Sequence, residues 1–181
     1  MLEVRIHGRG GQGGVTSAEL LAQAVIAQGR FAQAFPSFGP ERRGAPVVAF
    51  VRIDDQKIRL REKIYEPNLI LVLDPTLLDI INIAEGLKEG GIIITNASIN
   101  ATELVAKYKW TRVAQVPADI IAHEELGVPI TNTTMLGALI KISKVVPLSA
   151  MEPVIVNRFG AKLGLKNYKA LTRAYYETMI V

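Results

Sequence analysis

The 181-residue sequence contains no cysteine and only two histidines, His7 and His123. Without thiols the chain can form no disulfide, carries no thiol nucleophile and cannot hold an iron–sulfur cluster through its own cysteines. Two imidazoles are also too few for a histidine-rich metal site. We therefore expect no metal centre in this chain.

Long apolar stretches and basic clusters are also missing. No segment approaches the roughly 18 apolar residues of a membrane span, and the N-terminus leads into a strand without the apolar core of a signal peptide. The net charge of +4 mildly favours acidic partners, but no basic run is interleaved with aromatic residues. We expect a cytoplasmic protein that binds neither membrane nor nucleic acid.

Apolar strands alternate with helical patterns along the chain. This order predicts an α/β fold in which residues 1–181 form one Rossmann-like domain, with a mostly parallel sheet flanked by helices. An antiparallel hairpin, formed by strands 47–53 and 57–60 around the turn 54–56, is expected as an addition to the sheet. The remaining expected strands cover 2–7, 68–74, 92–95 and 112–116. Helices are expected at 75–89, 118–126, 133–145, 149–163 and 167–178. Another helix is expected to follow the first glycines and to stop near Gly29. A further helix, capped by Asn100, is expected to begin near residue 101.

Five glycines fall in the seven positions from Gly8 to Gly14, directly after the first predicted strand. Glycine permits backbone conformations closed to other residues and lets a ligand approach the chain. A loop that opens a helix also presents unpaired N–H groups, which suit phosphate. The candidate phosphate-contacting residues are Gly8, Arg9, Gly10, Gly11, Gln12 and Gly13.

This loop satisfies the pattern G-x-G-x-x-G, but one part of a dinucleotide site is absent. Such sites carry an acidic residue about 20 residues later to bind the ribose hydroxyls. Residues 30–36 contain no acid, which disfavours an NAD-linked enzyme. The other alternative is that the glycines only allow the helix to pack closely on the sheet or on a partner.

Two further groups of polar residues suggest contacts with other chains. The first strand places Glu3, Arg5 and His7 on one face, so it lies at an edge or its polar face meets solvent or another subunit. Residues 30–46 predict an ordered loop that carries Glu41, Arg42 and Arg43. Rigid loops with aromatic and arginine side chains suit interfaces and anion recognition, although a local ion pair on the surface is the simpler alternative.

Two motifs together resemble one protein family. Arg5 to Gly13 reads R-x-H-G-R-G-G-Q-G, and Ala34 to Val47 reads A-F-P-x-F-G-x-E-R-R-G-A-P-V, followed by R-I-x-D. These motifs resemble the gamma subunit of 2-oxoacid:ferredoxin oxidoreductases, with the pyruvate-type enzymes as the nearest match. The likeness continues through Leu73-Asp74-Pro75, Ile130–Ala138, Lys166-Asn167 and Ala174-Tyr175.

The resemblance implies a subunit that assists a reaction held elsewhere in a complex. Such enzymes decarboxylate a 2-oxoacid on thiamine diphosphate, transfer electrons through iron–sulfur clusters to ferredoxin and pass the acyl group to coenzyme A. Thiamine diphosphate, Mg and the clusters would lie on partner subunits (alpha, beta and delta), which agrees with the absence of cysteine. The chain also lacks a credible nucleophile–base pair, so we expect no catalytic residue here.

Within this family the chain is expected to help bind coenzyme A through the glycine loop. Asn132 and Thr133, at a sheet-to-helix junction, are expected to cap that helix or to touch the same ligand. The row Glu3, Arg5 and His7 and the residues Glu41 to Arg43 would face partner subunits. A purely structural subunit and a free-standing nucleotide-binding enzyme remain the alternatives, and the identity of the 2-oxoacid stays open.

Overall fold

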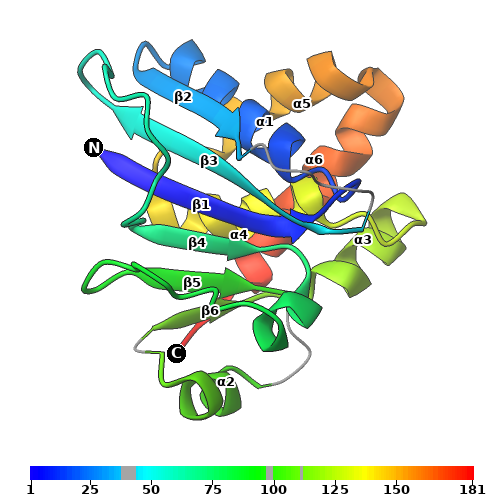
Figure 1. The fold of residues 1–181 in the computed structure, drawn as a ribbon. Helices are drawn as coiled ribbons and strands as arrows, with labels where there is room; N and C mark the ends of the chain where they lie inside the picture. Colours follow the sequence, from blue (N-terminus) through cyan, green and yellow to red (C-terminus); the bar gives the residue numbers. More distant parts are fainter. Residues whose placement is uncertain (38–43, 97–99, 111) are drawn as a thin grey trace.

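The computed structural model describes residues 1–37, 44–96, 100–110 and 112–181. A seven-stranded sheet in the order β2-β3-β1-β4-β5-β6-β7 runs through the molecule (Figure 1). The four adjacent strands β1, β4, β5 and β6 are parallel, so their carboxyl ends meet at one edge. β3 pairs antiparallel with β1, β2 with β3 and β7 with β6. The bounds are β1 Leu2–Arg9, β2 Phe31–Pro36, β3 Pro46–Asp54, β4 Leu69–Val72, β5 Ile92–Thr95, β6 Val113–Gln115 and β7 Met179–Ile180.

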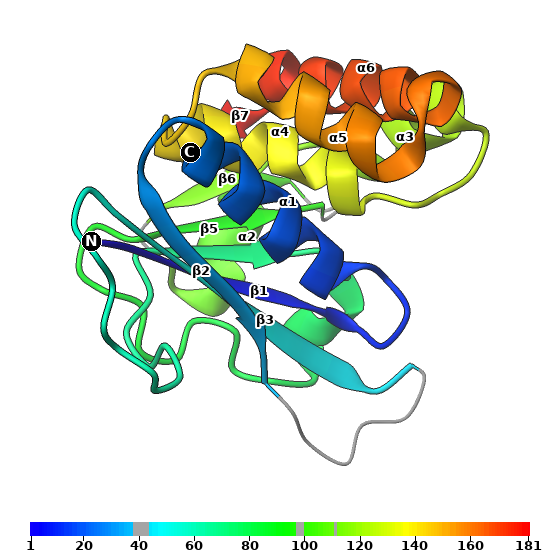
Figure 2. The ribbon, with the colours of Figure 1, turned by 90° about the horizontal axis from the view of Figure 1, so that it is seen from above.

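The two faces of the sheet are covered differently (Figure 2). One face carries five α-helices, and the other carries α2, a short 3-10 helix η1 and irregular segments. The helical bounds are α1 Gly14–Ala27, η1 Pro75–Asp79, α2 Ala101–Tyr108, α3 Ala118–Leu126, α4 Asn132–Ser143, η2 Leu148–Ala150, α5 Met151–Phe159 and α6 Ala161–Glu177. This arrangement confirms the expected Rossmann-like α/β fold.

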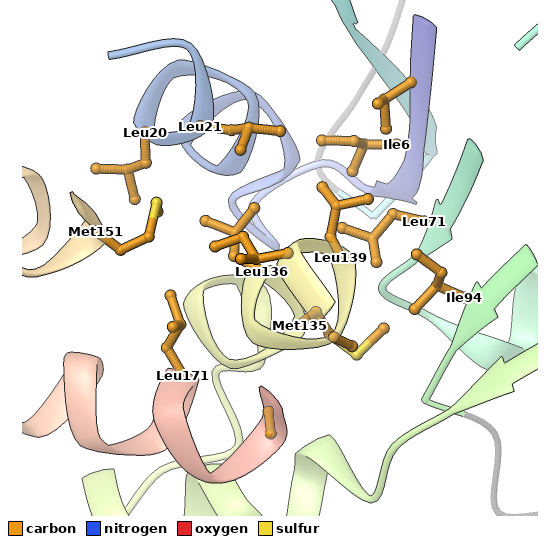
Figure 3. Close-up of a cluster of buried hydrophobic side chains, with 14 of the residues drawn as sticks. Ile6, Leu20, Leu21, Leu71, Ile94, Met135, Leu136, Leu139, Met151 and Leu171 are labelled. Atoms are coloured by element: carbon orange, nitrogen blue, oxygen red, sulfur yellow. The ribbon is translucent and has the colours of Figure 1, made fainter. Parts of the chain in front are cut away.

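The main hydrophobic core lies between the sheet and the five-helix layer. Ile6, Leu71 and Ile94 point from neighbouring strands toward Leu136 and Leu139 of α4 (Figure 3). Because α4 is packed between the sheet and α6, every residue from Asn132 to Ile140 is buried. A smaller core on the opposite face takes the alternate residues of the same strands, including Ile70, Val72 and Ile93. β4 and β5 are therefore apolar on both faces, as their sequence predicted.

The antiparallel hairpin differs from the expected one. Its strands are β2 and β3, whereas residues 57–60 form no strand. In β2 the residues Ala32 and Ala34 pack on the main core, while Phe35 meets Phe50 of β3 at a ring-centroid distance of 5.2 Å. Pro36 is tolerated because it ends an edge strand. The prolines and glycines of residues 30–46 favoured a loop, so the sequence did not predict the strand β2.

The long helix expected over 75–89 is also wrong, since only Pro75–Asp79 forms a helix. The next residues turn across the sheet, with Ile83 buried beneath them. The carbonyl oxygens of Ile83 and Glu85 accept hydrogen bonds from the buried guanidinium of Arg5. These carbonyls are therefore bonded to Arg5 instead of to amides of a helix. The local pattern of apolar residues could not predict a donor so distant in the sequence.

The C-terminal helices also differ in their boundaries. α5 ends at Phe159, and Gly160, with φ 77° and ψ 162°, separates it from α6, which starts six residues before its predicted position. The chain then forms β7, a strand that the sequence did not predict. The predicted cap of α2 is confirmed, because Asn100 Oδ1 accepts a hydrogen bond from the Thr102 amide at 2.8 Å.

Gly137 allows α4 and α6 to approach closely, and this contact gives a testable prediction. A Cβ at Gly137 would lie 2.0 Å from the carbonyl oxygen of Leu171, a backbone atom that cannot move independently. We expect Gly137→Ala to lower the free energy of unfolding by about 3 kcal/mol, measured by urea denaturation. Gly29→Ala is the matched control, because its φ is 77° but no atom lies within 4 Å. The control should lose only about 1 kcal/mol, and equal losses would contradict a rigid helix contact.

Candidate functional site

The glycine loop connects the carboxyl end of β1 to the N-terminus of α1. Gly11 and Gly13 have φ values of 93° and 77°, which favour glycine at both positions. Gly13 also packs against Asn132 of α4, since an added Cβ would lie 2.5 Å from Asn132 Nδ2. The Gly10 amide donates to the carbonyl of Ala45 at 2.9 Å, and the Gly10 carbonyl accepts from the Gly44 amide at 3.2 Å. The loop is therefore held from both sides.

Asp74, two residues after the end of β4, binds the loop through its side chain. Its Oδ2 accepts hydrogen bonds from Arg9 Nε at 2.9 Å and from Gln12 Nε2 at 2.8 Å. Its Oδ1 accepts from the amide of Thr76 at 2.9 Å and from the Thr76 hydroxyl at 2.6 Å. Burial alone would raise the pKa of Asp74, but the hydrogen bonds from Thr76 and Gln12 and the charge of Arg9 lower it overall. Asp74 is thus a carboxylate whose two oxygens are fully engaged.

Arg9 and Gln12 have structural partners besides Asp74. Arg9 Nη2 donates to Thr76 Oγ1 at 2.8 Å, and Arg9 Nη1 donates to the carbonyl of Gly44 at 3.1 Å. Gln12 Oε1 accepts from the Arg9 amide at 2.7 Å. Both predicted side chains therefore lie at the loop, where they fix its shape, and Arg9 is already paired with a carboxylate.

Backbone N–H groups remain as the donors that the loop can offer. Gly14, Val15 and Thr16 form the first turn of α1, where amides have no partner within the helix. No acidic side chain lies in this turn, and Gly13 provides no side-chain cap. A cavity of about 320 Å³ opens beside these residues and is lined by Gly8, Arg9, Gly10, Gly11, Gly13, Gly14, Val15, Thr16 and Val47. We call it the glycine cavity.

Two further cavities continue from the glycine cavity along the carboxyl edge of the sheet. The middle cavity, of about 450 Å³, shares Gly11 with the first and includes Asp74, Asn96 and Thr131. The outer cavity, of about 480 Å³, shares Asn96 and Asp119 with the middle one and has an apolar wall that includes Ile120. We call the three together the edge trough. Crevices at the carboxyl ends of parallel strands are the usual ligand sites of open α/β sheets.

Asn96, immediately after β5, lies where the middle and outer cavities meet. It is only 5% exposed, and its Oδ1 accepts from the Asp119 amide at 3.2 Å. Its Nδ2 is buried and has no hydrogen-bond partner among the residues that the structure describes. Asn96 and Asp119 were not among the predicted site residues, although the position of Asn96 at the end of a predicted strand could have indicated it.

The structure places the neighbouring residues Asn132 and Thr133 in different surroundings. Asn132 lies against the glycine loop, and its carbonyl accepts a hydrogen bond from Ser17 Oγ at 3.2 Å. Thr133 is fully buried and donates through its hydroxyl to Asn167 of α6. The capping role expected for these residues is wrong, because Thr131 precedes α4 as its N-cap and no side chain caps that helix.

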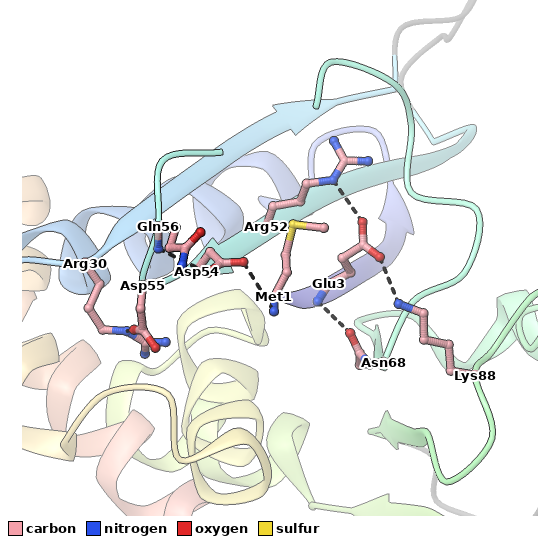
Figure 4. Close-up of polar contacts among 9 residues, drawn as sticks. All are labelled: Met1, Glu3, Arg30, Arg52, Asp54, Asp55, Gln56, Asn68 and Lys88. Carbon is pink, nitrogen blue, oxygen red and sulfur yellow. Dashed lines mark hydrogen bonds and ion pairs between the residues drawn. The ribbon is translucent and has the colours of Figure 1, made fainter. Parts of the chain in front are cut away.

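The polar row of β1 lies inside the chain. β1 is a central strand, and Glu3, Arg5 and His7 are at most 9% exposed. Glu3 Oε1 accepts from Arg52 Nε at 2.9 Å, and Glu3 Oε2 accepts from Lys88 Nζ at 3.0 Å (Figure 4). The row therefore finds its partners in this chain, rather than in the partner subunits that the sequence led us to expect.

The buried pair of Glu3 and Arg52 is the ionic centre of this face. Arg52 is 1% exposed and also donates to the carbonyls of Glu62 and Lys63, at 2.8 and 3.2 Å. Burial would raise the pKa of Glu3, but hydrogen bonds from Arg52 and Lys88 and their charges lower it overall. The segment after β3 is thereby attached to the sheet.

Three predicted interface residues, metal binding and membrane spans remain to be compared with the structure. Glu41, Arg42 and Arg43 lie outside the described residues. Among the described residues, no group of three or more histidines or carboxylates could hold a metal ion. Within the same ranges, no helix has the length and apolar character needed to cross a bilayer.

Comparison with known proteins identifies the family. Residues 3–177 match the model of the pyruvate ferredoxin/flavodoxin oxidoreductase family. The chain is 49% identical over 182 residues to the pyruvate/ketoisovalerate oxidoreductases common subunit gamma of Thermococcus litoralis, covering 99% of this chain and 98% of that relative. It is 48% identical over 179 residues to the pyruvate synthase subunit PorC of Methanocaldococcus jannaschii, with the same coverage. The chain belongs to this family and is a subunit of a 2-oxoacid:ferredoxin oxidoreductase, as its motifs implied.

Solved structures agree with this assignment. The crystal structure of pyruvate oxidoreductase subunit PORC from Thermotoga maritima matches with a TM-score of 0.88 and 37% identity, over 99% of this chain and 97% of that one. The 2-oxoglutarate:ferredoxin oxidoreductase from Magnetococcus marinus has the same fold with a TM-score of 0.77 and 18% identity. There the match covers 97% of this chain but 30% of the longer one.

The Glu3–Arg52 pair generates a stability prediction. Glu3→Gln should lower the free energy of unfolding by about 3–5 kcal/mol, because it leaves the Arg52 charge buried without its partner. Urea denaturation at neutral pH measures the loss. Lys88→Gln is the control and should lose less than about 1 kcal/mol, since Lys88 is 36% exposed on its side chain.

The same variant gives a pH dependence. The pKa of Glu3 lies below its ordinary value of 4.5 in the folded chain. Its contribution to stability is therefore fully present above that value and is lost as the pH falls through the lower, folded pKa. The difference between wild type and Glu3→Gln should shrink in that acidic range, and a difference that grows on acidification would contradict this sign.

Proposed function

We propose that this subunit binds coenzyme A in the edge trough and closes one side of the active assembly of the oxidoreductase. The observation that carries the proposal is the glycine cavity, which is lined by Gly14, Val15 and Thr16 of the first turn of α1, a turn that contains no acidic side chain. The diphosphate and 3′-phosphate of coenzyme A are multiply charged, and oriented backbone N–H groups bind such anions.

The length of the edge trough supports an extended ligand. Coenzyme A has a phosphate-rich nucleotide end and a long neutral arm, and the three neighbouring cavities of about 320, 450 and 480 Å³, which share lining residues, offer room for both. The middle cavity contains the carboxylates of Asp74 and Asp119 and the amide of Asn96. Carboxylates disfavour phosphate, so we assign the phosphates to the glycine cavity and neutral parts of the ligand to the rest of the trough.

In this proposal Arg9 acts mainly as a positioning residue. Its guanidinium donates to Asp74, Thr76 and Gly44, which holds the loop in the conformation that exposes the amides. Its positive charge is largely offset by Asp74. Backbone N–H groups then supply most of the attraction, and Gly8, Gly10, Gly11, Gln12 and Gly13 give the loop its shape.

The hydrogen bonds that Asp74 accepts argue against an NAD-linked enzyme. Asp74 is the acidic side chain at the carboxyl end of β4, which pairs directly with β1. A ribose-binding acid needs free oxygen atoms to accept hydrogen bonds from hydroxyl groups. Both oxygens of Asp74 already accept two hydrogen bonds each.

The chemistry of the reaction belongs to other subunits in this proposal. Thiamine diphosphate, Mg and iron–sulfur clusters would be held by alpha, beta and delta partners, with ferredoxin as acceptor and the cytoplasm as location. The absence of cysteine supports this division. The Thermococcus litoralis relative is called a common subunit of pyruvate and ketoisovalerate oxidoreductases. The Magnetococcus marinus structure contains 2-oxoglutarate, coenzyme A and succinyl-CoA.

A charge placed in the glycine cavity tests the coenzyme A role. Thr16→Glu adds a carboxylate to the first turn of α1, where it suits the helix dipole but repels phosphate. In the assembled enzyme we expect the KM for coenzyme A to rise at least about tenfold, while the KM for the 2-oxoacid stays unchanged. Steady-state rates of acyl-CoA formation measure both KM values. Thr16→Gln, similar in size but neutral, should behave as wild type. An unaltered KM for coenzyme A in Thr16→Glu would favour a purely structural subunit.

The proposed partner contact has a separate test. Glu41, Arg42 and Arg43 would face another subunit of the complex, as the rigid composition of residues 35–46 favours. Arg42→Glu combined with Arg43→Glu should reduce co-purification of the partner subunits with this chain. Arg158→Glu, which reverses a charge on α5 far along the chain, serves as the control. An intact complex in the double variant would contradict the interface assignment.

A further inference from the structure

A fourth cavity lies on the side of β1 away from the five-helix layer. It has a volume of about 270 Å³, and its lining includes Arg5, His7, Lys63, Tyr65, Asn82 and Glu85. It shares no residue with the edge trough. We call it the far-face cavity. It holds buried charged and polar groups of β1 to which the proposed function gives no role.

Arg5 and Arg52 differ in their counter-charges, although both are buried on this face. Arg52 Nε donates to the carboxylate of Glu3. Arg5 donates to His7 Nε2 at 3.0 Å and to the carbonyls of Ile83 and Glu85. Within the described ranges no carboxylate oxygen hydrogen bonds to Arg5. Burial lowers the pKa of Arg5 and outweighs the charge of Glu85, which acts to raise it. A buried cation without a bonded anion is costly, so this position is suited to accept one.

His7 presents a buried donor for which the described residues supply no acceptor. Its Nε2 accepts from a guanidinium, so in the neutral ring the proton must sit on Nδ1. Burial and then the charge of Arg5 lower the pKa of His7 to about 3, which keeps the ring neutral. His7 is 5% exposed, and its Nδ1 has no hydrogen-bond partner in the part of the chain that the structure describes. A buried N–H of this kind requires an acceptor.

We infer that the far-face cavity is a binding site for a small anion, of the class of short-chain monocarboxylates or inorganic phosphate. Arg5 and His7 would supply the hydrogen bonds. Lys63 adds a second positive charge to the lining, and Glu85 is the single carboxylate among the described residues that line it. The cavity is smaller than the roughly 300–1,000 Å³ of sites for drug-sized molecules, which favours a ligand of a few heavy atoms.

Histidine NMR tests this inference directly, because the chain has only two histidines. The full chain, labelled with ¹⁵N-histidine, is titrated with pyruvate, with inorganic phosphate and with sodium chloride at matched ionic strength. We expect the Nδ1 signal of His7 to shift with saturation for pyruvate or phosphate, and the stronger of the two identifies the source of the anion. The exposed His123 of α3 is the internal control and should not shift.

A variant separates a true site from a general salt effect. Arg5→Gln should weaken the binding at least about tenfold, as expected when a charged hydrogen-bond donor is lost. Arg30→Gln, which removes an arginine paired with exposed Asp55, should bind as wild type. If Arg5→Gln does not fold, the wild-type titration alone decides the matter. An unchanged His7 signal with both anions, or equal shifts at His7 and His123, would overturn the inference.

Discussion

The hydrogen bonds of Asp74 are the constraint on which the geometry of the glycine loop depends. One carboxylate connects β4 to Arg9 and Gln12 of the loop and to Thr76 of η1, with donor–acceptor distances from 2.6 to 2.9 Å. Glycine-rich backbone has many accessible conformations, and fixing one of them costs entropy. The charged pair and its neighbours offset that cost, so that the first-turn amides of α1 can be held open toward the glycine cavity. Binding to a pre-organised loop then loses less entropy than binding to a mobile one.

The two faces of β1 show how one strand can serve two purposes. Val4 and Ile6 pack in the main core, and on the opposite face Glu3 binds Lys88 and Arg5 binds the carbonyl of Ile83. The loops after β3 and η1 are thus attached by charged hydrogen bonds rather than by a second layer of helices. This leaves the carboxyl edge free for the trough. Such cavities suit the assisting role that we propose for this subunit.

Much of the fold could be predicted because its signals are local. The apolar runs of β4 and β5 predicted buried parallel strands, and the glycines after β1 predicted the loop that opens α1. The errors arose where distant residues decide the structure. Arg5 bonds to the carbonyls of Ile83 and Glu85, 78 and 80 residues away, where a helix was expected. Glu3 finds Arg52 only through the antiparallel register of β1 and β3. For the site, the sequence predicted the place of the glycine loop between β1 and α1. The pairing of Arg9 with Asp74 and the buried Nδ2 of Asn96 depend on the order of strands in the sheet, which the sequence alone could not provide.

In the function that we propose, the backbone amides of the glycine loop and of the first turn of α1 contact the phosphates of coenzyme A. Hydrogen–deuterium exchange of the assembled oxidoreductase, with and without coenzyme A, measures those amides directly. We expect slower exchange on coenzyme A binding in the peptides that contain residues 10–17, with little change in α6. Unchanged exchange across residues 10–17 in a complex saturated with coenzyme A would contradict it.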